Sequence, residues 1–291
     1  MIKKEQTEIK GLPFPKPTAV QIKVSNRLKR LIKRMQIDIN KEIIKLSKSK
    51  EAKAYTEATQ VYKTVKDGAT MDAITFATLS DRTMNALYKK WTGIFNKMTA
   101  PFIKNMMLLT DRQSSSAVRN STKDMPFNSS IASKIIPKPL KISIQASVKE
   151  STSLIKSLPD QYISQLQGDI QRNITGQGTS FAKLKESIAK NLKNRNGMVQ
   201  RRANNIVRDQ VNKIYADMNH SRLRSAGVQD FDWQHNGGSK EPRQYHKSVL
   251  NGNRYSFNDP PVIDPNTGAR GLPGDLIHCN CTSRPVYTQR A

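Results

Sequence analysis

Apolar residues recur at intervals of three and four along the first part of the chain. This spacing places them on one face of a helix, and no proline interrupts the run between Thr18 and Ala100. Residues 11–17, GLPFPKP, precede the run and contain too much proline to be helical. The pattern predicts an amphipathic helix whose apolar face carries Leu28, Leu31, Ile32, Met35, Ile39, Ile43 and Leu46.

A second helix is predicted over about 71–107, with Trp91 in its core and Pro101 as a place where it could break. Residues 110–142 are rich in Ser, Thr, Asn, Lys and Pro, a composition typical of a flexible linker or an extended arm. Helical periodicity returns at residue 142 and predicts three more helices. They are expected from 142 to Gly176 with Pro159 in a first turn, from 180 to a turn at 194–197, and from 198 to 225, where Gly227 follows as the stop signal.

The period changes to that of extended chain after Gly227. Phe231 and Trp233 alternate with aspartates, and two further short strands are expected at 254–257 and 285–288. Loops rich in Gly and Pro separate these strands. Because the segment has few apolar residues, it needs a staple or a packing neighbour to be stable.

Together these patterns predict a mainly α protein, with extended long-helix N-terminal and middle regions and a small α+β C-terminal module. We expect four parts. They are an N-terminal basic helical region at 1–109, a Ser/Pro-rich linker or arm at 110–142, a helical middle domain at 143–227 and the small module at 228–291.

The chain has 49 Lys and Arg against 23 Asp and Glu, a formal charge of +26, and residues 1–227 carry +25 of it. Such a charge favours a polyanionic partner. Because no helix-turn-helix or aromatic platform is apparent, we expect non-specific contact with the backbone of double-stranded DNA, or contact with an acidic protein. A solvated face without a partner is the alternative. The candidate contact residues are Lys23, Arg27, Arg30, Arg34, Lys41 and Lys45.

The sequence also excludes some classes. No stretch approaches the roughly 20 consecutive apolar residues that span a membrane, and the first residues lack the apolar segment of a signal peptide. We therefore expect a chain made in the cytosol, with no membrane partner and with reduced cysteines.

Cys279 and Cys281 are separated by one residue, too close for a relaxed disulfide. Two thiolates and the upstream imidazole of His246 are ligands of the kind that select zinc, and a bound zinc ion would supply the stability that the module lacks. The expected fourth ligand is His278, with His235, Asp275 or a water as the alternatives.

The competing interpretation is that both cysteines are buried and inert, with His246 hydrogen-bonded to a loop carbonyl. Catalysis is not expected, because the module lacks H-E-x-x-H, G-x-S-x-G, a P-loop and paired catalytic carboxylates. Its aspartates Asp259, Asp264 and Asp275 adjoin Pro or Gly, as turn formers do. Arg243 is expected to brace its loop.

Three stretches in order, at 201–233, 241–252 and 272–286, resemble the phage Mu protein F-like family of minor head proteins. In the family pattern a helix of the form R-A-x-x-I-A-R-T-E leads through a Gly-ended turn and a Trp strand to P-R-x-x-H with a following Gly, and then to a P-G loop ending in C-x-C. Asp209 and Gln210 replace the usual Thr-Glu here. The matching residues are Arg202, Ala203, Ile206, Arg208, Trp233, Pro242, Arg243, His246, Gly252, Pro273, Gly274, Cys279 and Cys281.

The resemblance covers roughly residues 145–288. It implies a structural, non-enzymatic minor capsid protein of a tailed bacteriophage, present in multiple copies inside the virion near the portal vertex and in the host cytoplasm during assembly. The implied roles are virion assembly and DNA packaging and ejection, with the portal protein, other capsid proteins and packaged DNA as partners. Arg202, Arg208, Trp233, Arg243 and Gly252 would be structural motif residues. The alternatives are a metal-dependent nuclease or toxin-like domain on a helical stalk, and a DNA-condensing protein.

Overall fold

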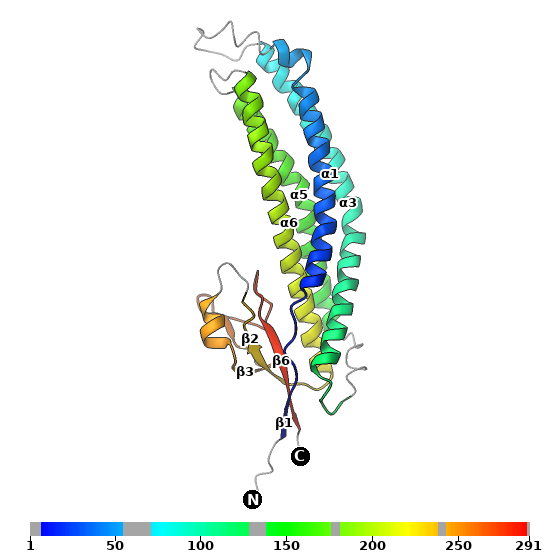
Figure 1. Ribbon diagram of the computed structural model, residues 1–291, viewed down its shortest axis with the longest axis vertical. Helices are drawn as coiled ribbons and strands as arrows, with labels where there is room; N and C mark the ends of the chain where they lie inside the picture. The colour runs from blue at the N-terminus through cyan, green and yellow to red at the C-terminus, as the bar shows by residue number, and fades with distance from the viewer. Residues whose placement is uncertain (1–6, 55–70, 128–137, 176–180, 238–242, 290–291) are drawn as a thin grey trace, which may run out of the picture. The chain divides into compact units, whose positions relative to one another are not determined.

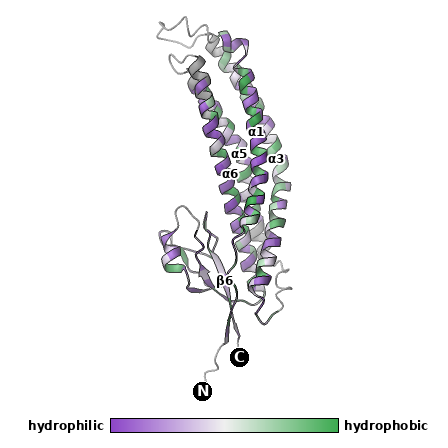
Figure 2. Cartoon of the chain, in the orientation of Figure 1, coloured by the Kyte–Doolittle hydropathy of each residue, from purple (hydrophilic) through white to green (hydrophobic). Residues whose placement is uncertain are grey.

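The computed structural model describes residues 7–54, 71–127, 138–175, 181–237 and 243–289 (Figure 1). The fold is mainly helical with a small sheet module, as the sequence predicts. Figure 2 shows hydrophilic and hydrophobic residues interspersed along the helices, as in amphipathic helices. The long helices are α1 (Thr18–Leu46), α3 (Met71–Ser121), α5 (Lys138–Thr175) and α6 (Phe181–Ser225).

The chain forms two compact units whose residues interleave along the sequence. We call them the strand unit, which comprises Met1–Val24, Pro101–Ser151 and Asn205–Ala291, and the helical unit, which comprises Ser25–Ala100 and Thr152–Asn204. All four long helices contribute residues to both units. Among the described residues, no helix is both long enough and apolar enough to cross a membrane.

The core of the helical unit takes one apolar face from each helix. Asp38 on α1 accepts hydrogen bonds from Nε1 of Trp91 at 2.8 Å and from Nζ of Lys90 at 2.7 Å, both on α3. Burial is the largest single effect and opposes the charge of Asp38. The two bonds and the charges of Lys90 and Lys41 together outweigh it and lower the pKa of the carboxyl. Trp91 is buried and is a core residue, as predicted. Other buried residues of this unit are Leu28, Ile32, Met35, Ile39, Ile43, Met84, Leu87, Phe95, Leu158, Ile163, Leu166 and Ile170.

Three predictions about where helices begin, break or turn are wrong. Pro101 lies inside α3, Pro159 lies inside α5, and α6 runs through the expected turn at 194–197. A proline inside a helix removes one backbone hydrogen bond. Burial of the neighbouring apolar residues offsets this local cost, since Phe102 and Leu158, each next to a proline, are almost fully buried.

The predicted linker at 110–142 is also wrong in its described parts. Residues 110–121 complete α3, and α5 already begins at Lys138, while residues 128–137 lie outside the described ranges. The polar side chains that suggest a linker are used within the fold. Thr110 donates its hydroxyl to the carbonyl oxygen of Met106 at 2.9 Å, and Ser114 donates to Oδ1 of Asn219 on α6 at 2.6 Å.

The strand unit contains a four-stranded antiparallel sheet in the order β1-β6-β2-β3 and a separate β4-β5 hairpin. The predicted strands at 230–234, 254–256 and near the C-terminus are confirmed, whereas strand β1 was not anticipated. The strands are β1 (Thr7–Lys10), β2 (Asp230–Gln234), β3 (Arg254–Ser256), β4 (Val262–Asp264), β5 (Ala269–Arg270) and β6 (Thr282–Gln289).

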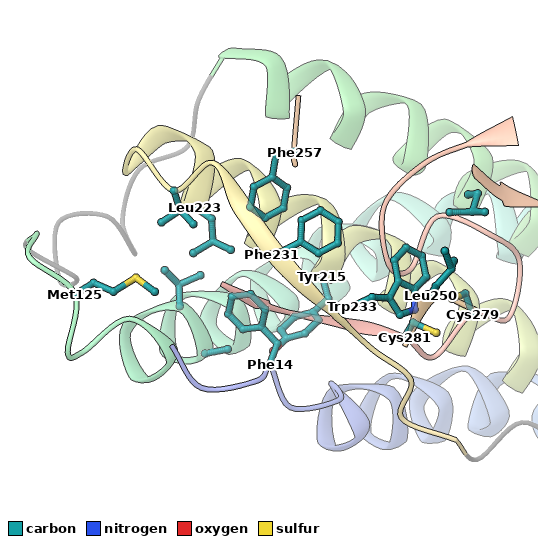
Figure 3. Close-up of a cluster of buried hydrophobic side chains, with 14 residues drawn as sticks. Phe14, Met125, Tyr215, Leu223, Phe231, Trp233, Leu250, Phe257, Cys279 and Cys281 are labelled. Atoms are coloured by element: carbon teal, nitrogen blue, oxygen red, sulfur yellow. The ribbon is translucent and has the colours of Figure 1, made fainter. Parts of the chain in front are cut away.

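The predicted boundary at Gly227 does mark the end of α6, where Gly227 adopts a φ of +85°. It does not separate two folding units. Strand β1 pairs with β6 from the other end of the chain, and Phe14 joins the same buried cluster as Trp233 (Figure 3). Residues from α3 and α6, including Val118, Tyr215 and Leu223, belong to this cluster too. The C-terminal segment therefore obtains its missing core from neighbours, one of the two routes that its composition suggested.

Candidate metal centre

One imidazole and two thiols meet inside the strand unit. The Nδ1 or Nε2 atom of His246 and the Sγ atoms of Cys279 and Cys281 all lie within 4.8 Å of one another. Their residues are 2%, 4% and 6% exposed, so water is almost excluded from the group. Figure 3 shows the two cysteines beside Trp233 and Leu250, at one end of the buried cluster. This group could hold a metal ion, as predicted for the three residues.

The three ligands come from two segments of the chain. His246 opens a π-helical turn, His246–Leu250, in which the amide of Asn251 donates to the carbonyl oxygen of His246 at 3.1 Å. Such single turns often occur at functional sites. Cys279 and Cys281 immediately precede β6, and they share one side of an extended chain because they are two residues apart.

The orientation of the His246 ring leaves one nitrogen free for a ligand. A carbonyl oxygen can only accept, so Nε2 of His246 donates its proton to the carbonyl of Ile263, at 2.8 Å. Nδ1 is then the unprotonated nitrogen. It lies 3.7 Å from Sγ of Cys279 and 3.6 Å from Sγ of Cys281. Histidines that bind metals usually donate their second ring N–H in this way, which fixes the tautomer and the ring orientation.

The distances fit a tetrahedral ion. Zinc bound about 2.3 Å from sulfur and about 2.0–2.1 Å from nitrogen holds those two ligand atoms about 3.6 Å apart. Both measured nitrogen–sulfur separations, 3.7 Å and 3.6 Å, agree with that value. The competing interpretation expected an inert His246 bonded to a loop carbonyl. His246 does bond to a backbone carbonyl, but that carbonyl belongs to Ile263 on strand β4. This hydrogen bond does not compete with metal binding, because it uses the other ring nitrogen.

The two thiols are electrostatically linked. The hydrogen bond from Cys281 lowers the pKa of Cys279, although burial opposes this. The bond to Cys279 and burial raise the pKa of Cys281. The Nε1–H of Trp233 is buried without an ordinary hydrogen-bond partner in the described structure, and its interaction with the Cys281 sulfur favours the thiolate. A cation between the two sulfurs would stabilise both thiolates at once.

The expected fourth ligand, His278, is not part of the group. Its φ of +60° is unusual, and its backbone N–H donates to Oδ1 of Asp209 at 2.7 Å, while its Nδ1 is buried without a partner in the described structure. It lies in the turn that precedes Cys279, and its ring nitrogens do not belong to the described group of ligand atoms. The alternative ligand Asp275 also lies outside the group. Its Oδ2 accepts the amide of Leu272 at 2.7 Å, and although the residue as a whole is exposed, local desolvation of the carboxyl raises its pKa to about 6.

His235, the other protein alternative, does touch the group. Its Nδ1 lies 3.6 Å from Sγ of Cys281. Burial lowers the pKa of this half-buried imidazole, which favours the neutral form that binds metals. Its backbone N–H donates to Oδ1 of Asn251, at 2.8 Å, directly after the π-helical turn that carries His246.

Two residues of the predicted motif brace the site. Arg243 donates to the carbonyl oxygen of Ile277 at 3.0 Å, which confirms its role as a loop brace. Gly252 adopts a φ of +82° and donates its amide to the carbonyl oxygen of Trp233 at 2.8 Å, a conformation that few side chains would allow. Arg202 is exposed and Arg208 is half-buried on α6, and neither belongs to the metal-ligand group.

Two other residues support the site, and no sequence motif marks them. Asn212 on α6 donates from Nδ2 to the carbonyl oxygen of Cys279 at 3.2 Å, and Ile263 on β4 accepts the proton of His246. Ile263 acts through its backbone, so no side-chain motif could have revealed it. Asn212 lies two residues after Gln210 in the helix of the matched pattern, and only its place opposite the cysteine loop shows its role.

The predicted polyanion-contact residues of α1 are all exposed, and they alternate with its buried apolar face. Lys45 forms an ion pair with Glu42, and Asn26, Lys29, Arg30, Lys33 and Gln200 line a shallow hollow of the helical unit. Most of this face therefore presents cations to solvent, as a phosphate-binding or acid-binding surface requires. No imidazole or thiol belongs to it.

We compared the chain with models of protein families, with curated protein sequences and with solved structures, and no match was found in any of the three comparisons.

Proposed function

We propose that this chain is a structural minor head protein of a tailed bacteriophage, positioned near the portal vertex, where it contacts the portal protein and packaged DNA. One observation carries the proposal. The three stretches that resemble the Mu protein F-like family supply Trp233, His246, Cys279 and Cys281, and these side chains converge in one buried cluster. A chance likeness of scattered residues would not be expected to build a common site.

Zinc is the metal that we propose for the His246–Cys279–Cys281 group. Two thiolates and an imidazole are soft and borderline ligands, which favour zinc over magnesium or calcium. The ion would tie the π-helical turn to the chain that leads into β6, and its binding energy would add to the stability of the fold. We expect a structural role, because no carboxylate belongs to the described metal-ligand group.

The basic face of α1 would provide the contact with the portal protein or with packaged DNA. Cations on a regular helical face can neutralise DNA phosphates or pair with acidic patches on a portal protein, and salt weakens both contacts. The charge does not come from the metal-binding segment, since residues 228–291 carry +1 of the total of +26.

The test is the protein content of gradient-purified phage particles produced from a genome that encodes this chain. We expect the chain in intact particles at low copy number, and cross-links between it and the portal protein. Its absence from intact particles would sink the head-protein proposal. A nuclease activity of the purified chain that His246→Ala abolishes, with the position in the particle unchanged, would favour the enzymatic alternative instead.

A further inference from the structure

His235 lies beside the three-ligand group, and we propose that it completes a Cys2His2 zinc site with His246, Cys279 and Cys281. This inference rests on the proposed zinc binding and assigns the remaining ligand. It is drawn from the 3.6 Å separation between Nδ1 of His235 and Sγ of Cys281, the same as that between His246 and Cys281.

The sheet register places His235 opposite Cys281. Strands β2 and β6 are antiparallel, with Trp233 paired to Ser283 and Gln234 paired to Thr282. One further step along the same register brings His235 opposite Cys281. Directly opposed residues of antiparallel strands hold their side chains close together on one face, so this contact follows from the pairing of the strands.

The ligand side chains of the two segments also lie on the sides that face each other. Trp233 and His235 are two residues apart, as are Cys279 and Cys281, so each pair points to one side of its extended chain. Trp233 packs edge-on against the His246 ring, with ring centroids 5.2 Å apart. The side of β2 that carries Trp233 therefore faces the metal-ligand group, and His235 lies on that side.

Hydrogen bonds fix the chain around His235. Its N–H donates to Oδ1 of Asn251, as described above, and Nδ2 of the next residue, Asn236, donates to Oγ1 of Thr282 at 2.6 Å. The first bond connects His235 to the residue that follows the turn of His246, and the second connects it to the start of β6. The backbone of the fourth ligand is thus tied to the elements that supply the other three.

His235 differs from the other three ligands in exposure. It is half-buried, whereas His246 and the two cysteines are buried, and only Cys281 among the three is within contact distance of its imidazole. A turn of this side chain toward Cys279 would close the tetrahedron. The charges then balance, because two thiolates and two neutral imidazoles leave a divalent ion with no net charge inside the protein.

The experiment titrates the metal-free full-length chain with Zn²⁺ against a competing chelator, in the wild type and in His235→Ala, His278→Ala and Cys279→Ser variants. We expect one tight site in the wild type and a loss of affinity of at least about tenfold in His235→Ala, since even supporting residues around metals contribute 10- to 100-fold. His278→Ala should leave the affinity unchanged. Circular dichroism checks that each variant has kept its helices.

The outcomes distinguish the proposed zinc site from the assignment of His235 as its fourth ligand. Tight zinc binding that His235→Ala leaves unchanged overturns the assignment of His235 and preserves the zinc site. Absence of zinc binding by the wild type, or unaltered binding by Cys279→Ser, overturns the zinc site and the assignment with it. X-ray absorption of the zinc-loaded wild type provides a test without mutation. Two sulfurs and two imidazole rings around the ion support the proposal, and a single imidazole refutes it.

Discussion

Nε2 of His246 donates a hydrogen bond to the backbone carbonyl oxygen of Ile263, at 2.8 Å. This one bond decides what the histidine can do, because it commits one nitrogen to that carbonyl and leaves the other facing the two thiols at 3.6–3.7 Å. Strand β4 thereby acts on the candidate metal centre without contributing a side chain.

Metal removal should destabilise the strand unit. In zinc-loaded protein, a chelator should lower the free energy of unfolding by about 4 kcal/mol if free zinc was about 1,000 times the dissociation constant. Fluorescence of Trp233 in a Trp91→Phe background reports this unit alone, since the chain has 2 tryptophans and Trp91 lies in the other unit. Cys279→Ser should not respond to the chelator. An unchanged wild type would contradict zinc stabilisation.

Gly11 should not tolerate a side chain. A Cβ at this buried position would clash with the backbone carbonyl oxygen of Ser121 and come within 2.8 Å of the Pro285 ring. Backbone cannot move aside cheaply, so Gly11→Ala should cost about 1–3 kcal/mol of unfolding free energy, measured through Trp233. The matched control is Gly93→Ala in α3, where a Cβ meets nothing within 4 Å. That change should stabilise the helical unit by up to about 1 kcal/mol, and equal effects at both sites would refute the packing explanation.

His220 should make stability depend on pH. Burial and then the charge of Arg224 lower the pKa of this imidazole to about 3, and its Nε2 lies 2.7 Å from Oγ of Ser283. An unfolded histidine binds a proton near pH 6.5, so stability is full above that pH and falls as the pH decreases toward 3. At pH 5 the loss should be about 2 kcal/mol.

A comparison of metal-free wild type with His220→Gln isolates this effect. Asp275, whose pKa is raised to about 6, has the opposite sign, since the folded state binds its proton first as the pH falls. The Asp275 contribution is common to both proteins and cancels when they are compared. Denaturant unfolding at pH 7.5 and pH 5 measures the change in unfolding free energy of each protein. Parallel stability curves for the two proteins would show that His220 is not buried in its neutral form.

The basic face of α1 should govern DNA binding. Replacing Lys23, Arg27, Arg30, Arg34, Lys41 and Lys45 by Gln should weaken binding and reduce the slope of log affinity against log salt by up to about 5, at about 0.9 per phosphate contact. The control replaces six other exposed lysines, which changes the net charge equally. These are Lys89, Lys97, Lys104, Lys156, Lys190 and Lys193. If the salt-dependence slope falls equally in both variants, DNA contacts are spread over the surface and α1 is not the specific contact face. An unchanged slope in the α1 variant alone would assign this face to a protein partner.

These tests use the whole chain for a structural reason. A fragment of residues 228–291 would lose strand β1, and it would also lose Phe14, Val118 and Tyr215 from its core. Neither zinc binding nor DNA binding by such a fragment would then report on the native fold.

The amphipathic helices and the ligand types could be predicted from the sequence because both depend on local pattern. The repeat of Leu28, Ile32, Met35 and Ile39 predicts the buried face of α1, and those residues are buried. The spacing of Cys279 and Cys281 predicts that both sulfurs face one way. The break near Pro101 and the first-turn position of Pro159 were predicted wrongly, because the packing of neighbouring apolar residues outweighs the local cost of proline.

The choice among candidate ligands could not be made from local pattern. His278 adjoins Cys279 in the chain yet lies outside the group, whereas His246 comes from 33 residues away. The residues that meet depend on the antiparallel register of β2 and β6 and on the π-helical turn after Tyr245. Periodicity carries no information about which strands pair.

The amino-acid sequence by itself determined the helical faces, the segregation of charge and the presence of soft metal ligands, since each follows from residue type and spacing. The tertiary structure alone decided that the N-terminal strand completes the C-terminal sheet and that the His246 ring turns Nδ1 toward the thiols. The physical reason is that pairing between distant segments is selected by the burial and the hydrogen bonds of the whole fold, which no short stretch of sequence contains.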